Sequence, residues 1–378
     1  MYSLYWFGFF WSNKLKVFKK LRSEKSFIPE DWISLGDFFI SIKNFFKPSN
    51  CFNNKIKYPK LNINYLILRE KRIYLEKIVT LLRFWIYFPS LKKWSQNCEM
   101  LICIDHYENM IFEHALIAAA KNLNIKVKTY GYHHTLSSKE FTAWHSLNEE
   151  WKSNYKPDYV ISLGPVSKKM LTTQGTPRDR IIDGPALRYS DMIKKNFVHD
   201  KKNKNDIAVP LSQVGDASIE VLNAVKKLSD QLKNTDYRFI IKPHPNSNIT
   251  KTLNLLGLNN LPSNIIISNK SLDSLLNECL FTIFLSTGAA YDAILNGNIV
   301  FNLSSELNIM ENYLDIFEED FSFVGSYTVD KIEEVLSQLS SDNSKINKYM
   351  DEFERLRLYL QDNMHIVTEE KLSNFKVN

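Results

Sequence analysis

Lys242 and His244 stand in a Lys-Pro-His-Pro segment that directly follows the apolar run Arg238–Lys242. Proline restricts its own backbone torsion, so Pro243 and Pro245 hold the histidine in a rigid loop. Lysine and histidine side chains both donate hydrogen bonds to phosphate oxygens, and a protonated histidine adds positive charge. We interpret the segment as a phosphate-binding loop, with a turn that carries a solvated histidine as the alternative.

A second segment with binding chemistry is Leu285–Ala290, in which Ser286, Thr287 and Gly288 follow an apolar run and precede a helical one. The free N–H groups at the start of a helix bind anions, and glycine lets a phosphate approach the backbone closely. Serine and threonine are also common helix caps in the absence of any ligand. The two uses are compatible, and we predict a phosphate contact here.

A catalytic carboxylate is expected in the segment Asp105–Glu113, after the apolar run Met100–Ile104. A carboxylate there could take the proton of an acceptor hydroxyl as a general base. Asp105 and Glu108 also have the spacing of a helix capping box, which is a purely structural use. Glu113 lies five residues after Glu108, so the two side chains would not share a helix face. Glu113 also stands in an otherwise apolar run, where burial of a charged side chain is costly without a partner. The three carboxylates remain alternatives.

Other residues at predicted strand ends are candidates for donor or acceptor contacts. The adjacent His133 and His134 point in different directions, so we expect no shared metal, and acceptor binding and a structural role stay open. Arg188 could meet an anionic sugar or be a plain surface arginine. In the second half, the predicted contacts with a donor sugar, phosphate or base are made by Ser212, Gln213, Ser268 and Asn269.

Apolar strands and amphipathic helices alternate from residue 99 onward, which is typical of parallel α/β sheets. In the first half, strands are predicted at Met100–Ile104, Ile125–Tyr130, Tyr159–Leu163 and Arg180–Asp183, and helices at Asn109–Lys121 and Ser167–Thr173. Before residue 99, we expect a strand at Leu61–Leu68 and a helix at Glu70–Phe88 that Pro89 ends.

The second half repeats this alternation after a lysine- and asparagine-rich stretch, Asp191–Asn205, which we interpret as a linker. The predicted strands are Ile207–Leu211, Arg238–Lys242, Asn264–Ser268, Phe281–Leu285 and Ile299–Leu303. The predicted helices are Ala217–Leu232, Leu272–Glu278, Ala289–Asn296, Thr328–Leu339 and Lys345–Asp362. We therefore expect two doubly wound α/β domains that face a cleft, over residues 1–195 and 196–345, with a C-terminal helix and tail over 346–378 that packs back on the first domain.

Composition and charge narrow the class of protein. The chain has 378 residues, a net charge of +6 and 44% hydrophobic residues, which suits two ordinary domains and is too weakly basic to imply nucleic acid. Its four cysteines form no C-x-x-C pair, so we expect a reducing cytoplasm and neither disulfide nor zinc site. The apolar Met1–Trp11 precedes the basic Lys14–Arg22, the reverse of a signal peptide. For the basic stretch, an interfacial helix on the inner membrane and a helix packed on its own domain remain alternatives.

Several chemistries lose support because their motifs are missing. The sequence holds no Asp-x-Asp, no G-x-G-x-x-G, no Walker motif and no G-x-S-x-G. A metal-bound diphosphate, a redox cofactor, ATP hydrolysis and ester hydrolysis are therefore not expected. We predict no metal and no cofactor.

The rigid His244-Pro245 after a strand and the Ser286-Thr287 pair before a helix resemble motifs of the bacterial sialyltransferases, polysialyltransferases and Kdo transferases. In those enzymes of the GT-B fold, the motifs hold the CMP part of the donor. The first half resembles surface carbohydrate biosynthesis proteins in five places: Tyr107–Asn109, Glu113, Gly131–His134, Pro157-Asp158 and Gly184–Tyr189. The carboxylate-carboxylate-glycine base motif of the sialyltransferases has no counterpart here.

The resemblance implies a metal-independent glycosyltransferase that moves a Kdo- or sialic-type ulosonic acid from a CMP-sugar to a surface polysaccharide or glycolipid. Its first domain would bind the glycan acceptor and supply the base, while the second would bind the nucleotide-sugar donor. A UDP-sugar or CDP-glycerol donor is one alternative, because CDP-glycerol transferases share a His-Pro and a Ser-Ser at similar places. A non-catalytic nucleotide-binding partner in polysaccharide assembly is the other.

Overall fold

The structure of the chain is a computed structural model. It describes residues 3–4, 26–45, 78–139, 141, 144–194, 203–258, 260–305, 310–341 and 343–373. The predicted basic helix Lys14–Arg22 and strand Leu61–Leu68 lie outside the described residues, as do Cys51 and most of Met1–Trp11. The other cysteines, Cys98, Cys103 and Cys279, are free thiols.

Contacts between residues divide the chain into two compact units, which we describe separately. The first unit comprises residues 1–131 and 149–159, and the second comprises residues 132–148 and 160–378. The predicted boundary at residue 195 does not coincide with this division, because the segment 160–194 belongs to the second unit.

Four strands form one sheet, in the order β3-β4-β5-β6. Their bounds are β3 Met100–His106, β4 Lys126–Tyr132, β5 Tyr159–Ser162 and β6 Ile181–Asp183. The helices of this part of the chain are α2 Leu35–Phe45, α4 Ile78–Trp94, α5 Ile111–Lys121, α6 Pro165–Thr173 and α7 Ser190–Lys194. β1 Ser3–Leu4 and β2 Ser26–Phe27 form a separate parallel pair. β3 is two residues longer than predicted and therefore includes Asp105 and His106.

Helix α4 continues through Pro89 to Trp94, so the prediction that Pro89 ends it was wrong. A proline inside a helix leaves the carbonyl four residues earlier without its N–H donor. Here Ser41 Oγ of α2 lies 3.3 Å from that carbonyl, on Trp85, while it also donates to Asp37 O of its own helix at 2.8 Å. Helix α2 thus packs against α4 where the proline removes the bond. No helix within the described ranges combines the length and apolar character that crossing a membrane requires.

Six strands form a fully parallel sheet in the order β12-β11-β10-β7-β8-β9. Their bounds are β7 Asn203–Pro210, β8 Arg238–Lys242, β9 Ile265–Ile267, β10 Cys279–Phe284, β11 Ile299–Leu303 and β12 Ser326–Tyr327. The helices are α8 Gly215–Gln231, α9 Ile249–Leu255, α10 Leu272–Glu278, α11 Ala289–Leu295, α12 Val329–Ser341, α13 Asn343–Asn363 and α14 Glu369–Ser373. Every residue of β10 and β11 is buried, as expected for strands covered by helices on both faces.

The predicted α/β class with two sheets is confirmed, and most predicted elements lie within two residues of their observed bounds. The linker prediction was wrong at both ends, because α7 occupies residues 190–194 and β7 begins at Asn203. Local composition misled here, since the polar side chains of α7 and early β7 obscure the apolar period. Helices α2 and α9 were not predicted.

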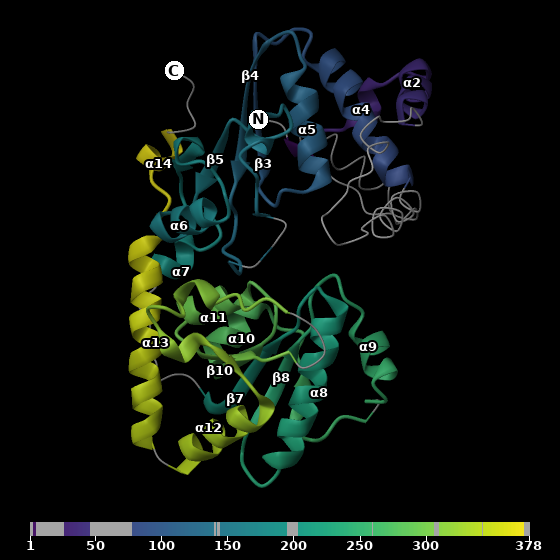
Figure 1. The fold of residues 1–378 in the computed structure, drawn as a ribbon. Coiled ribbons are helices and arrows are strands. Elements are labelled where there is room, and N and C mark those ends of the chain that lie inside the picture. The colour runs from purple at the N-terminus through teal and green to yellow at the C-terminus, as the bar shows by residue number, and fades with distance from the viewer. Residues whose placement is uncertain are drawn as a thin grey trace, which may run out of the picture. The chain divides into compact units, whose positions relative to one another are not determined.

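The C-terminal part of the chain crosses the second unit. Helix α13 contacts both α11 and α6, and it is the long yellow helix of Figure 1. After it, His365 donates its backbone N–H to Leu163 O at 2.7 Å and accepts from Ala186 N at 2.7 Å. Gly164 is required beside this crossing, because its φ is +136° and a Cβ atom there would lie 2.5 Å from Asn363 O.

Candidate functional site

The strand order of the six-stranded sheet marks where a ligand would bind. From β7 the chain proceeds outward to β8 and β9, and then returns to the other side of β7 to add β10, β11 and β12. The direction reverses between β7 and β10, and in open parallel sheets ligands bind beyond the carboxyl ends of strands at such a switch point. The residues that follow β7 and β10 are Ser212 and Ser286.

The hydroxyls at this switch point already have partners within the protein. Ser212 donates its hydroxyl to Ser286 O at 2.8 Å and accepts from Val214 N at 3.1 Å. Ser286 donates its hydroxyl to Glu311 Oε2 at 2.8 Å. Ser286 also has a φ of 47°, a region that residues other than glycine seldom adopt and that is common at functional sites. The two serines therefore shape the loops, and their predicted ligand contacts remain predictions.

Gly288 lies where α11 begins, next to a cationic side chain. A Cβ atom added to Gly288 would lie 3.4 Å from Thr135 Oγ1 and 3.8 Å from Arg188 Nη1. The absence of a side chain thus leaves room beside the Arg188 guanidinium. Thr287 contributes an internal contact, because its Oγ1 accepts from Ala289 N at 3.4 Å. Helix α11 has seven residues and is buried throughout, so its amino end adds little charge by itself.

An ion pair holds Arg188 in this position. Arg188 Nη2 donates to Asp292 Oδ2 at 2.5 Å, and the Arg188 side chain is 40% exposed whereas that of Asp292 is 7% exposed. Burial raises the pKa of Asp292 above its ordinary value, and the neighbouring Arg188 opposes that rise. The guanidinium is planar and carries donors on both terminal nitrogens, so pairing through Nη2 directs Nη1 toward Gly288.

The Lys242–Pro245 loop begins at the last residue of β8, the strand next to β7. Asn246 N donates to His244 Nδ1 at 3.2 Å, which places the hydrogen of the neutral ring on Nε2. Burial lowers the pKa of His244 below its ordinary value, so the ring is neutral at pH 7. The neutral ring can offer its Nε2–H as a donor, and the predicted contact of His244 with a phosphate remains a prediction. Lys242 is half-buried on the same loop, and Pro245 is exposed.

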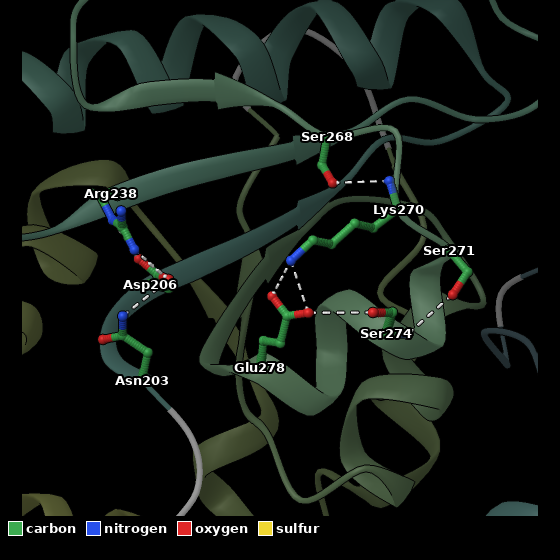
Figure 2. A network of polar contacts seen from close by, with 8 residues as sticks. All are labelled: Asn203, Asp206, Arg238, Ser268, Lys270, Ser271, Ser274 and Glu278. Carbon is green, nitrogen blue, oxygen red and sulfur yellow. Dashed lines mark hydrogen bonds and ion pairs between the residues drawn. The ribbon is translucent and has the colours of Figure 1, made fainter.

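The loop after β9 is organised by its own contacts, which Figure 2 shows. Lys270 N donates to Ser268 Oγ at 3.2 Å, and Lys270 Nζ donates to Glu278 of α10 at 2.6 Å. Gln213 and Asn269 have exposed side chains on their respective loops. The predicted contacts of these residues with a donor remain predictions. At the opposite end of the strands, Arg238 pairs with Asp206 through two nitrogens, both at 2.7 Å.

The structure places His133 in the core, where no substrate reaches it, which corrects the predicted acceptor contact. Its side chain is fully buried, its Nδ1 lies 2.6 Å from Ser167 Oγ, and its ring packs edge-on to Trp144. Burial lowers the pKa of His133 to about 3, so the ring is neutral. His134 is half-buried, and its predicted contact with an acceptor remains a prediction.

In the first unit, three carboxylates surround His106 at the end of β3. Asp105 Oδ1 lies 3.1 Å from His106 Nδ1, while Glu113 Oε1 and Glu108 Oε2 lie 3.5 Å and 3.9 Å from His106 Nε2. Asp105, chiefly through its hydrogen bond, raises the pKa of His106. Burial raises the pKa of Glu113 to about 7.

Glu113 also caps α5. Its carboxylate accepts from Glu108 N at 3.0 Å and from Met110 N at 3.2 Å, and Met110 is the residue before the helix. The capping box expected from Asp105 and Glu108 was therefore wrong, because the helix begins two residues later than predicted and the capping carboxylate is Glu113. The carboxylate of Glu113, in an otherwise apolar run, thus has a structural role as the cap of α5.

The group His106, Glu108 and Glu113 could hold a metal ion. Within the described part of the chain, it alone brings three potential ligand atoms within 4.8 Å of one another. An imidazole and two carboxylates suit a divalent cation, and Asp105 on Nδ1 would orient the imidazole toward it. The prediction that the protein needs no metal remains a prediction.

Comparisons with known proteins yield structural matches only. No protein-family model and no curated protein matches the chain. The TarM structure has a TM-score of 0.48 at 14% identity over 77% of this chain, which spans only 57% of the TarM chain. A UDP-GlcNAc 2-epimerase from Neisseria meningitidis, bound to UDP-GlcNAc, has a TM-score of 0.47 at 16% identity over 82% of this chain and 84% of its own. HepE from Anabaena, in complex with UDP and glucose, has a TM-score of 0.44 at 11% identity, covering 76% of this chain and 82% of its own. These low scores assign no activity to the chain.

Several residues of these sites were not singled out from the sequence. Thr135, Asp292 and Glu311 join the switch-point loops through contacts between distant segments. Asp292 gave a usable signal, because an acidic residue in an otherwise apolar helix requires a partner. Thr135 and Glu311 gave none, since both stand in loops with no regular pattern.

Proposed function

We propose that the chain is a glycosyltransferase that takes a sugar from a nucleotide donor. The observation that carries the proposal is the position of the Arg188 guanidinium beside Gly288, at the switch point of a parallel sheet. This edge combines a fixed cation, a space without a side chain, and the neighbouring Lys242–Pro245 loop. Such a combination suits the phosphate of a nucleotide.

The proposed reaction joins an acceptor hydroxyl to the anomeric carbon of the sugar and breaks the bond between that carbon and the donor phosphate. The nucleotide leaves with an additional negative charge. Arg188, Lys242 and the Nε2–H of His244 would stabilise this charge as it develops. The acceptor proton would pass to a carboxylate of the segment Asp105–Glu113.

The class of donor follows from the number of hydrogen-bond donors at this edge. Arg188 keeps Nη1 available although its Nη2 pairs with Asp292, and Lys242 and His244 follow the neighbouring strand, so donors from two loops could bind two phosphates. A diphosphate donor such as a UDP-sugar matches them better. We therefore favour the diphosphate alternative over the CMP-activated ulosonic acid that the motif resemblance implies, and propose a glycan or glycolipid as the acceptor.

Nucleotide binding tests the proposal directly. Thermal shift and calorimetry with CMP, CDP and UDP should show stabilisation by at least one of them, with UDP or CDP stronger than CMP. Equal stabilisation by CMP and CDP would show that the second phosphate adds nothing, which would contradict the diphosphate choice, and stabilisation by none of the three would contradict the proposal.

Turnover provides the second test. With the nucleotide that binds, donor hydrolysis or transfer to added glycans should be measurable, and His244→Ala should lower kcat by about a hundredfold because one donor to the leaving phosphate is lost. Nucleotide binding without any turnover would instead support a non-catalytic role in polysaccharide assembly.

A further inference from the structure

The loop Tyr107–Met110, which joins β3 to α5, presents Glu108 at the surface of the first unit. We propose that Glu108 is the catalytic base and that the buried Lys156, which lies 47 residues away in the sequence, is a positioning residue that fixes this loop. The choice of Glu108 rests on the proposed function. The role of Lys156 in fixing the loop can be tested without it.

The exposure of the three carboxylates separates their roles. The side chain of Glu108 is 33% exposed, whereas those of Asp105 and Glu113 are 16% and 2% exposed. Asp105 contacts the backbone N–H and the ring of His106, and Glu113 binds backbone N–H groups. A base must reach the proton it removes, and Glu108 is the carboxylate that a substrate can reach most readily.

Lys156 is buried to an unusual degree for a lysine. It is 1% exposed, and its Nζ donates to Asn109 Oδ1 at 2.5 Å and pairs with Glu150 Oε2 at 2.9 Å. The same Nζ lies 5.4 Å from the centre of the Trp151 ring. Burial of a lysine costs free energy unless its ammonium group has hydrogen-bond partners. A buried lysine at this position therefore indicates a structural role for its contacts.

The reason lies in the backbone of Asn109. Its φ is 59°, a left-handed conformation that asparagine tolerates better than most residues. Asn109 Oδ1 is contacted by His114 Nε2 at 2.8 Å as well as by Lys156. An amide oxygen only accepts hydrogen bonds, so His114 donates through Nε2. Two donors from different elements therefore hold one side-chain oxygen and, with it, the turn.

The residues on both sides of Asn109 are fixed as well. Glu108 N and Met110 N donate to Glu113, as described above. The Tyr107 ring is buried against Gly131, where a Cβ atom would lie only 2.8 Å from Tyr107 Cδ2. The backbone of the loop is thus held by contacts from four residues, Glu113, His114, Gly131 and Lys156. Backbone conformations of this kind persist where the surroundings enforce them, and they are frequent at catalytic residues.

Three substitutions separate the contact from the backbone conformation. Lys156→Met removes the buried ammonium while keeping a side chain of similar length. Asn109→Gly keeps the left-handed conformation accessible but removes Oδ1, and Asn109→Asp keeps an oxygen that Lys156 can still bind. Lys152→Met changes an exposed lysine of the same segment and serves as the matched control.

Hydrogen exchange of the Glu108 and Met110 amides provides the direct measurement. We expect exchange at both amides to accelerate by about tenfold in Asn109→Gly and Lys156→Met, because loss of the charged hydrogen bond loosens the turn. Asn109→Asp and Lys152→Met should remain close to the native rate. In a transfer assay, the first two variants should lose kcat with an unchanged KM for the donor.

Unchanged exchange in Asn109→Gly would overturn the positioning role of Lys156, even if Lys156→Met failed to fold. Failure of the native protein to bind any nucleotide would refute the proposed function while leaving the exchange result interpretable. If donor turnover occurs and Glu108→Gln retains it fully, the choice of Glu108 as the base is wrong.

Discussion

In the first unit, the side chains of Glu113, Lys156 and His114 contact the loop that carries Glu108. In the second unit, the loops at the carboxyl ends of the strands form hydrogen bonds with each other. Ser212 binds the backbone of the Ser286 loop, and its own hydroxyl is thereby used. The first arrangement fixes one exposed carboxylate, and the second clears a space beside Arg188. A proton-transfer group must be held in a single geometry, while a phosphate with several oxygens can be bound by donors from several loops. The comparison therefore predicts different responses to substitution in the two units.

The largest effect is expected at the exposed carboxylate. Glu108→Gln keeps the size of the side chain but cannot accept a proton, so kcat should fall by about 10²–10⁴-fold with little change in donor affinity. Glu149→Gln, at an exposed glutamate of the first unit, is the control and should leave kcat unchanged. Steady-state kinetics with saturating acceptor provide the measurement. A loss of donor affinity without loss of kcat would contradict the assigned role.

Arg188→Ala should combine a binding defect with a stability defect. Loss of a charged donor to phosphate should weaken nucleotide binding by about 10–100-fold. Asp292 is left buried without its partner, so the free energy of unfolding should also fall. Adding Asp292→Asn should restore much of the stability and none of the affinity. Calorimetry and denaturant unfolding would distinguish the two, and recovery of affinity in the double variant would show that Arg188 does not contact the phosphate.

Gly131→Ala should destabilise the first unit without touching nucleotide binding. Its Cβ would lie 2.8 Å from the Tyr107 ring, and such overpacking costs about 1–3 kcal/mol. Gly215→Ala at the start of α8, where no atom lies within 4 Å of the added Cβ, is the matched control and should be neutral. Equal free energies of unfolding for the two variants in urea would mean that the Tyr107 loop shifts at little cost. The loop that carries Glu108 would then be no more rigid than the loops of the second unit.

The smallest effect concerns the pH dependence of His244. Its pKa is lowered below 6.5 by burial, so the ring stays neutral above that pH and contributes one hydrogen bond. The ratio of nucleotide Kd values for His244→Ala and the native protein should be about fivefold and constant from pH 7 to pH 8. It should rise only as the pH falls below 6.5, where the ring gains a proton. A ratio that already rises between pH 8 and pH 7 would show that His244 binds the phosphate as a cation.

The alternation of apolar runs and helical periods predicted the second unit well, because each buried strand of a parallel sheet is apolar along its whole length. β8 and α10 have the predicted bounds, and the Lys242–Pro245 loop follows its strand as expected. Prediction was poorer where packing overrides local preference. Helix α4 continues through Pro89 at the place where the separate helix α2 packs against it and brings Ser41 Oγ within 3.3 Å of the freed carbonyl.

The sequence by itself determined which polar residues stand at the carboxyl ends of strands, since strand ends follow from local apolar patterns. Only the tertiary structure decided which of them are available to a ligand. In the fold, the Ser212 hydroxyl donates to the loop of Ser286, and the His133 side chain is buried. Arg188 pairs with Asp292, and the buried Lys156 donates to Asn109. The physical reason is that strand and helix patterns depend on neighbours a few residues away, whereas a buried hydrogen bond depends on which distant segments the fold brings together.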